Sequence, residues 1–88
     1  MQLSDTPRRA HSVVSRLLDG EAVLVHPAQG KVRVLNSVGA RIWELVDGQR
    51  SIEEIARLIA QEYEVGLSQA EADALAFCLD LSGRGLLD

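Results

Sequence analysis

Cysteine is almost absent from this chain of 88 residues, and Cys78 is the one that occurs. An internal disulfide is therefore excluded, and so is a structural zinc site built from several cysteines. Aromatic residues are also few, namely Trp43, Tyr63 and Phe77. The core must then consist mainly of Leu, Ile, Val and Ala side chains.

Long apolar runs are missing too. No stretch reaches the roughly 18 apolar residues that a membrane-spanning helix requires. The amino-terminal stretch MQLSDTPRRAHS has no apolar segment of the kind found in signal peptides. The composition, with 47% hydrophobic and 25% charged residues, is that of a globular protein. We therefore expect one cytoplasmic domain without membrane association, and the chain length limits its core to a modest size.

Catalytic and metal-binding motifs are not found. The two histidines, His11 and His26, show no spacing such as HExxH, and no glycine-rich phosphate loop is present. Cys78 stands in an apolar row, which is typical of a core residue and not of a nucleophile. The residues therefore predict no catalytic group, no metal and no cofactor.

Positive charge is scarce in the second part of the chain. The net charge is −4: residues 1–35 hold five basic and three acidic residues, whereas residues 36–88 hold four basic and ten acidic ones. A protein that binds nucleic acid normally has Lys or Arg on its recognition element. The acidic second part therefore argues against a nucleic-acid partner.

The first part of the chain predicts strands. Residues 1–12 are polar and aperiodic, which predicts a flexible arm. The dipeptide Asp19-Gly20 favours a two-residue hairpin turn, and Pro27 ends the strand that returns from it. A third alternating stretch ends at Leu35, with Asn36 as a helix cap. The predicted strands cover residues 12–18, 21–26 and 31–35.

The remainder has the periodicity of helices. The first predicted helix covers residues 37–46. The second begins with a capping box formed by Ser51 and Glu54 and is expected to stop at Gly66. The third is expected to begin with a similar box at Ser68 and Glu71, and to run to about residue 81. This order predicts an α+β fold resembling a winged helix-turn-helix, with a three-stranded antiparallel sheet followed by three helices over residues 13–88.

Two surfaces of this predicted fold have no evident partner. In a simple meander the strand at residues 31–35 lies at an edge, and an open edge is either a hazard or a binding site. The third helix is apolar on more than one stripe. Its second row consists of Ala72, Leu75, Ala76 and Leu79. This row is expected either to meet more of the core or to line a shallow groove.

From Val23 to the carboxyl end the chain resembles the PqqD family, also called the RiPP recognition element. The resemblance is carried by the run VLVHPAQGKVRVLNSVGARIWELVDGQRSIEEIARLIAQEYEV and by the later run AEADALAFCLDLSGRGLL. The matching features are Leu35-Asn36 after a strand, Asp47-Gly48 after a helix, and a carboxyl-terminal Gly85-Leu86-Leu87. Their order and spacing, more than any single motif, make the resemblance specific.

The resemblance implies a domain that performs no chemistry. It implies binding of the leader segment of a ribosomally made precursor peptide, which adds as a strand between the third strand and the third helix. A separate leader peptidase or another modifying enzyme would then act on the precursor. The implied binding residues are Lys31, Val32, Arg33, Val34 and Leu35 on the strand, with Asp73, Ala76, Phe77 and Asp80 on the helix.

Within this family, residues 38–45 look more like the stand-alone leader-binding proteins of lasso-peptide biosynthesis than like PqqD proper. Val46 stands where PqqD proteins often have a cysteine before Asp-Gly. A PqqD-type peptide chaperone in quinone-cofactor biosynthesis remains one alternative. A small winged-helix DNA-binding regulator remains another, and Glu71, Asp73 and Asp80 on its would-be recognition helix argue against it.

Overall fold

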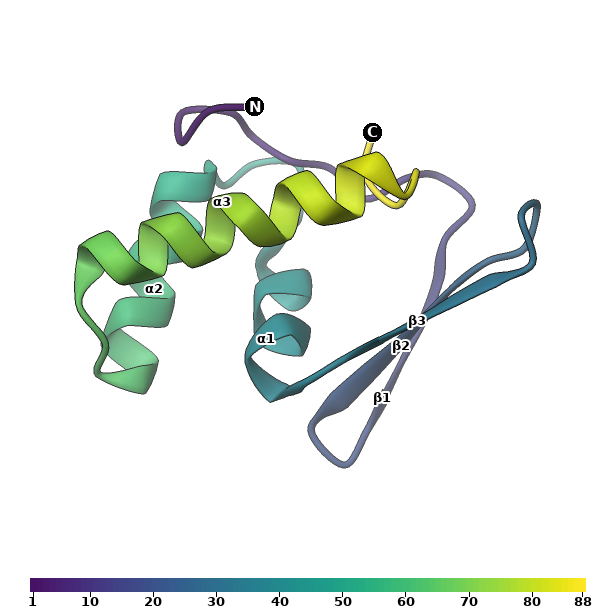
Figure 1. Cartoon of the computed structure of the whole chain (residues 1–88), viewed down its shortest axis with the longest axis horizontal. Coiled ribbons are helices and arrows are strands. Elements are labelled where there is room, and N and C mark those ends of the chain that lie inside the picture. The colour runs from purple at the N-terminus through teal and green to yellow at the C-terminus, as the bar shows by residue number, and fades with distance from the viewer.

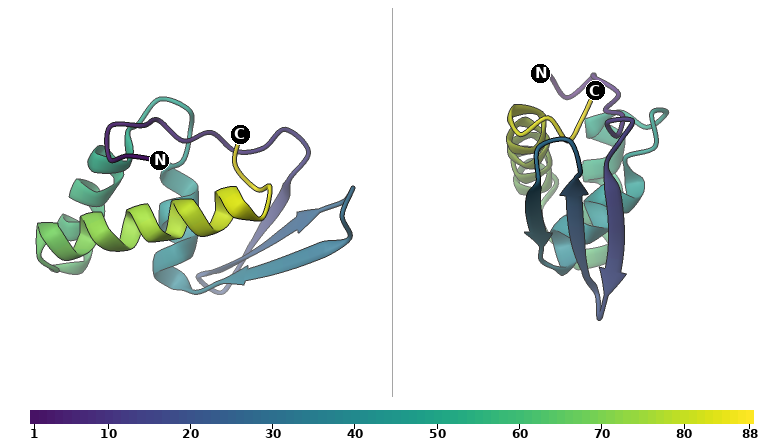
Figure 2. Two further views of the ribbon diagram at one scale, coloured as in Figure 1. Left: turned by 45° about the horizontal axis from the view of Figure 1, so that its top comes forward. Right: turned by 90° about the vertical axis from the view of Figure 1, so that its right-hand side faces the viewer.

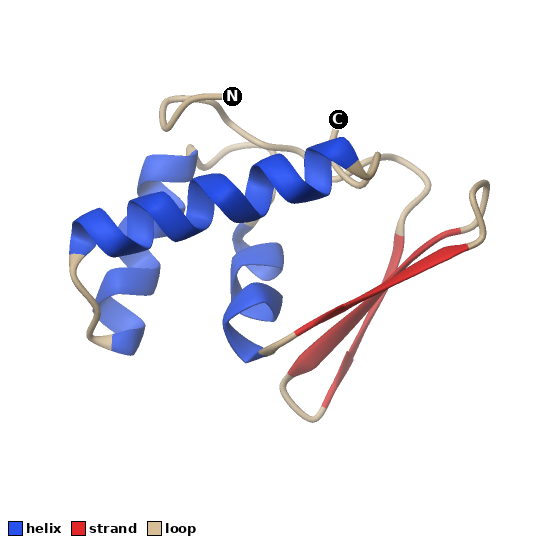
Figure 3. Ribbon diagram, viewed as in Figure 1, coloured by secondary structure: helices blue, strands red, loops and turns tan.

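Three strands are followed along the chain by three helices (Figures 1 and 3). The computed structural model describes all 88 residues. The elements are β1 (Val14–Leu18), β2 (Glu21–His26), β3 (Lys31–Leu35), α1 (Ser37–Leu45), α2 (Ile52–Tyr63) and α3 (Leu67–Gly83). This arrangement confirms the predicted α+β fold.

The sheet is an antiparallel meander with the order β1-β2-β3, so β3 lies at an edge as predicted. Leu18 pairs with Glu21 around the first hairpin. Both residues of the intervening turn have positive φ, 49° at Asp19 and 80° at Gly20, as a type I′ turn requires. Figure 2 shows β3 as the strand nearest α3, with β1 on the far side of the sheet.

One face of the sheet packs against the helices, and the other is open to solvent. The buried side chains of Ala22, Leu24 and Leu35 belong to the packed face and join the single core. The open face carries exposed aliphatic side chains at Val14, Leu18, Val32 and Val34. The core side chains contributed by the helices and the carboxyl-terminal segment are Ala40, Ile42, Trp43, Leu45, Val46, Ile52, Ile55, Ala56, Ile59, Ala70, Ala74, Cys78, Leu81, Leu86 and Leu87.

The starts of α1 and α2 follow the sequence prediction. The side chain of Asn36 accepts a hydrogen bond of 2.8 Å from the backbone N–H of Gly39. The capping box of α2 is complete, with bonds of 3.1 Å from Glu54 N–H to Ser51 Oγ and 3.0 Å from Ser51 N–H to the Glu54 carboxylate. These backbone and side-chain bonds with Ser51 lower the pKa of Glu54.

The start of α3 differs from the prediction. Gly66 does not end α2: the helix ends at Tyr63, and Glu64 reverses the chain with φ 54° and ψ 40°. Gly66 is already extended and serves as N-cap of α3 without a side-chain bond. Ser68 therefore lies inside the helix, and the predicted second capping box is wrong. The reason is that the left-handed residue is Glu64, which places the N-cap of α3 at Gly66, two residues before the predicted N-cap Ser68.

Residues 1–12 also differ from the free arm that their composition predicts. The carbonyls of Leu3 and Asp5 accept hydrogen bonds from the first N–H groups of α2, at 2.9 Å each. Pro7 is buried, and Arg9 pairs with Leu87 in an antiparallel bridge. The segment lies along the helices because it satisfies backbone donors that the start of a helix leaves free.

None of the helices combines the length and the apolar character needed to cross a bilayer.

Candidate functional site

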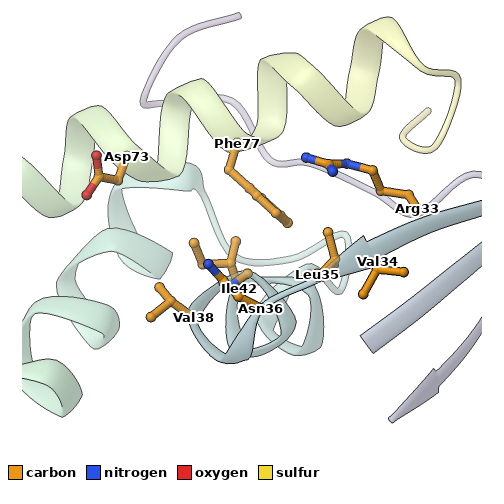
Figure 4. A pocket seen from close by; sticks show the side chains of 9 residues that line it. Arg33, Val34, Leu35, Asn36, Val38, Ile42, Asp73 and Phe77 are labelled. Atoms are coloured by element: carbon orange, nitrogen blue, oxygen red, sulfur yellow. The ribbon is translucent and has the colours of Figure 1, made fainter. Parts of the chain in front are cut away.

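An open cavity of about 530 Å³ lies between β3 and α3 (Figure 4). Its walls come from the end of β3, the start of α1 and one side of α3. The lining residues are Arg33, Val34, Leu35, Asn36, Val38, Gly39, Ile42, Asp73 and Phe77. The cavity therefore joins the sheet edge to an apolar surface.

Phe77 projects from α3 toward α1 and forms the apolar centre of this cavity (Figure 4). The ring lies so close to α1 that a Cβ atom at Gly39 would stand 3.1 Å from Phe77 Cε1. Only glycine leaves room for this contact without a shift. The presence of glycine inside α1, which costs helix stability of about 1 kcal/mol relative to alanine, thus has a structural reason.

The inner face of β3 carries the charged residues and the outer face carries the valines. Leu35 is buried, which identifies its face as the inner one, and strand alternation places Lys31 and Arg33 on the same face. Arg33 reaches Asp80 on α3, in agreement with this assignment. Val32 and Val34 are 62% and 55% exposed on the outer face.

The backbone of two β3 residues faces the open edge. The residues that flank a two-residue hairpin turn form a hydrogen-bonded pair, here Leu18 and Glu21. Such pairs alternate along a strand, so Ala22, Leu24 and His26 of β2 form their backbone bonds with β3. Their partners in β3 are Leu35, Arg33 and Lys31. Val32 and Val34 therefore direct their N–H and C=O groups away from the sheet.

On α3, Asp73, Phe77 and Asp80 occupy one side of the helix, at spacings of four and three residues. Asp73 and Phe77 line the cavity, and Asp80 bonds to Arg33. Ala76 is exposed and lines no cavity, so the structure does not bring it together with the others.

The second apolar row of α3 does not line a groove, which was one of the two alternatives predicted for it. Ala72 and Leu79 are exposed, Leu79 by 48%, and Leu75 packs against the core. The groove instead runs along the side of α3 that carries Phe77.

Asp80 connects β3 and α3, the two walls of the cleft that contains this cavity. Its Oδ2 accepts a hydrogen bond of 3.3 Å from Nη2 of Arg33 on β3. The same carboxylate accepts two contacts from Nε of Arg84, one turn further along α3, at 3.0 and 3.1 Å. Asp73, at the other end, accepts a 2.8 Å hydrogen bond from Gln69.

A smaller cavity of about 110 Å³ continues the cleft past Arg33. It is formed by the start of β3 and the end of α3. Its polar side chains are those of His26, Lys31, Arg33 and Arg84. The cleft is thus apolar beside Phe77 and basic at this end.

Several site residues were not predicted from the sequence, namely His26, Asn36, Val38, Gly39, Ile42 and Arg84. Arg84 follows Asp80 by four residues, a helical spacing that signals an ion pair. Val38 and Ile42 share a helical face and follow the edge strand directly, which is a signal that they border it. No local pattern signals that Gly39 lies under Phe77, because the two are distant in sequence.

Cys78 is fully buried in the core, as predicted. Burial raises the pKa of its thiol to about 11, so the thiolate is not formed near neutral pH. No group of three or more His, Cys, Asp or Glu side chains is arranged to hold a metal ion.

Comparison with known families places the chain in one of them. The model of the family described as Coenzyme PQQ synthesis protein D (PqqD) matches residues 21–87. The chain belongs to the PqqD family. The predicted family resemblance is therefore confirmed. A search of curated protein sequences gave no match.

Three solved structures are similar to this PqqD-family chain over nearly its whole length. TbiB1 in complex with the TbiA(beta) leader peptide is 36% identical, with a TM-score of 0.86, covering 92% of this chain and 94% of TbiB1. A lasso peptide synthetase B1 complexed with its leader peptide is 25% identical, with a TM-score of 0.85 and coverage of 96% and 99%. The PqqD truncation of Methylobacterium extorquens PqqCD, a stand-alone RiPP recognition element, is 27% identical, with a TM-score of 0.83 and coverage of 99% and 93%.

Proposed function

We propose that this PqqD-family protein binds the leader segment of a ribosomally made precursor peptide, as an additional strand beside β3. The observation that carries the proposal is that the open backbone of β3 borders the cleft: Val34 lines the apolar cavity around Phe77, and Val32 lines the smaller cavity next to it. Two of the similar structures are complexes with a leader peptide, one of them that of a lasso peptide synthetase B1, and the third is a RiPP recognition element.

In the proposed mechanism, the backbone of β3 supplies affinity and the side chains of the cleft supply selectivity. Hydrogen bonds from the edge of β3 hold any extended backbone, because they make no demand on side chains. Side chains of the leader that point into the cleft are selected by its walls, chiefly Phe77, Val38 and Ile42. An apolar anchor in such a pocket is the usual centre of binding energy.

The protein itself performs no reaction in this proposal. It delivers the precursor in the cytoplasm, where ribosomes make it, to a separate leader peptidase or another modifying enzyme. The similarity to a lasso peptide synthetase B1 favours a lasso-peptide precursor. Nucleic acid is not the proposed partner, because Asp73 and Asp80 occupy the side of α3 that faces the cleft.

Replacing Val34 with proline tests the proposed edge. The substitution removes an N–H group that points away from the sheet, so the ladder between β2 and β3 stays intact while a bond to the leader is lost. We expect an affinity loss of about tenfold or more, since one hydrogen bond and the local register are lost. The measurement is fluorescence polarisation of a labelled leader peptide, taken from a short reading frame beside the gene.

Ser15→Pro is the matched control, because Ser15 holds the corresponding outward position on β1, at the opposite edge of the sheet. It should bind the leader as the unchanged protein does. Circular dichroism establishes that both variants are folded. Equal affinities of folded Val34→Pro and Ser15→Pro would rule out β3 as the docking edge.

A further inference from the structure

We infer that the leader carries a carboxylate side chain, which Arg33 binds at the basic end of the cleft with Lys31 and Arg84 beside it. This inference rests on the proposed function and specifies the chemistry of its ligand. The basic end is the cavity of about 110 Å³ between the start of β3 and the end of α3.

Positive charge at this end exceeds the negative charge that faces it. Lys31, Arg33 and Arg84 all line the cavity. The only carboxylate in contact with any of them is that of Asp80, which bonds to both arginines. Lys31 has no ion pair. An excess of cations in a protein with a net charge of −4 is a local feature of the cleft and attracts an anionic group.

Arg33 is only partly satisfied by its partner Asp80. Its one contact, 3.3 Å to Asp80 Oδ2, is long for a charge-assisted bond. Asp80 is more closely engaged by Arg84, through contacts of 3.0 and 3.1 Å. The Nε atom of Arg33 is buried without any hydrogen-bond partner. A buried donor without a partner is costly and rare in folded proteins.

A carboxylate from the leader would satisfy Arg33. The guanidinium of Arg33 must first turn away from Asp80, because Nε is closed to solvent in this structure. Nε and one Nη then donate to the carboxylate in the bidentate geometry that arginine favours. Asp80 would keep its two contacts with Arg84. Leader binding would thus exchange one long contact of Arg33 for a pair of bonds. Before the leader binds, Asp80 holds Arg33 across the cleft, so Asp80 has a positioning role.

The strand geometry also sets the place of this carboxylate in the leader. Arg33 and Leu35 face the cleft, so a leader strand beside β3 points every second side chain into it. The apolar side chain that enters the Phe77 cavity and the acidic side chain that reaches Arg33 must then share a face. They should stand an even number of positions apart, about two or four.

Selection from a random peptide library tests this inference without knowledge of the leader. A messenger-RNA display library of peptides is selected on the whole chain. Display links the carboxyl terminus of each peptide to its messenger RNA, so any preference for a carboxylate must come from Asp or Glu side chains. We expect enriched peptides to place Asp or Glu at an even spacing from an apolar residue. In Arg33→Gln this acidic preference should disappear while the apolar preference stays.

Arg57→Gln is the matched control, because Arg57 lies on α2, pairs with Glu53 and lines neither cavity of the cleft. The best peptide is then measured by fluorescence polarisation. Changing its acidic residue to the amide should weaken binding about tenfold to the unchanged protein and to Arg57→Gln, but less than twofold to Arg33→Gln.

Enriched peptides without an acidic preference, or with one that persists in Arg33→Gln, would overturn the carboxylate site and leave leader binding standing. A different failure concerns the proposed function itself. If no peptide is enriched on the unchanged protein relative to Val34→Pro, the edge binds no strand, and both proposals fall together.

Discussion

At the scale of single residues, Cys78 shows how burial decides chemistry. The thiol is surrounded by core side chains, and its pKa of about 11 exceeds the ordinary value of 9.0 because burial disfavours the charged form. The folded protein therefore holds the thiol proton at pH values where the unfolded chain releases it.

This pKa predicts a loss of stability in alkali. The contribution of Cys78 is complete below pH 9.0, the unfolded value, and declines as the pH rises toward 11. Between pH 7 and pH 10 we expect the free energy of unfolding to fall by about 1 kcal/mol through this group. Urea unfolding at both pH values measures it, with Cys78→Ala as reference. An equal pH dependence in the two proteins would contradict the prediction.

At the scale of elements, the cleft depends on how closely α1 approaches the side chains of α3. Gly39 permits that approach, since its missing Cβ leaves room for the ring of Phe77. The wall of the cavity is therefore made by two helices that meet at a position without a side chain.

Gly39→Ala should separate stability from binding. Alanine favours the helix by about 1 kcal/mol, but its Cβ, 3.1 Å from Phe77 Cε1, pushes the ring toward the cavity. We expect little net change in stability and a several-fold loss of leader affinity, measured by urea unfolding and fluorescence polarisation. Gly66→Ala serves as control, because nothing lies within 4 Å of its added Cβ. Unchanged affinity of Gly39→Ala would show that the ring position does not matter for binding.

At the scale of the whole molecule, the two ends of the chain meet. The amino-terminal segment contacts the start of α2 and pairs with the carboxyl-terminal segment at Arg9 and Leu87 (Figure 1). The guanidinium of Arg9 lies 4.7 Å from the centre of the Trp43 ring and donates a 2.7 Å hydrogen bond to the Trp43 carbonyl. The segment therefore covers part of the core.

Deleting residues 1–10 should destabilise the fold. The deletion removes the carbonyl acceptors of Leu3, Asp5 and Pro7, which bond to N–H groups of Glu53, Ile52 and Gly48. At about 1 kcal/mol for each lost bond, we expect a loss of about 2 to 4 kcal/mol. Urea unfolding followed by Trp43 fluorescence measures it. Deletion of residues 1–2 alone leaves these carbonyls in place and should change little. Equal stability of both truncated proteins would restore the description as a free arm.

Local signals in the sequence determined much of this structure. The Asp19-Gly20 turn, the Asn36 cap and the Ser51 capping box act over a few residues, so their physics is contained in the chain itself. The edge position of β3 followed from the order of three short strands. Strand, helix and edge were therefore predictable, and family features in residues 23–88 indicated leader binding.

The tertiary structure decided everything that depends on contacts between distant residues. Alternation along β3 showed two faces but not which one packs inward, because that depends on where the helices lie. Placing Arg33 inward brought it to Asp80 on α3, and its position beside Lys31 and Arg84 made the cleft basic at one end. The packing of residues 1–12 likewise depends on N–H groups some 45 residues away. Sequence periodicity reports local geometry, whereas partners across the fold are chosen by packing.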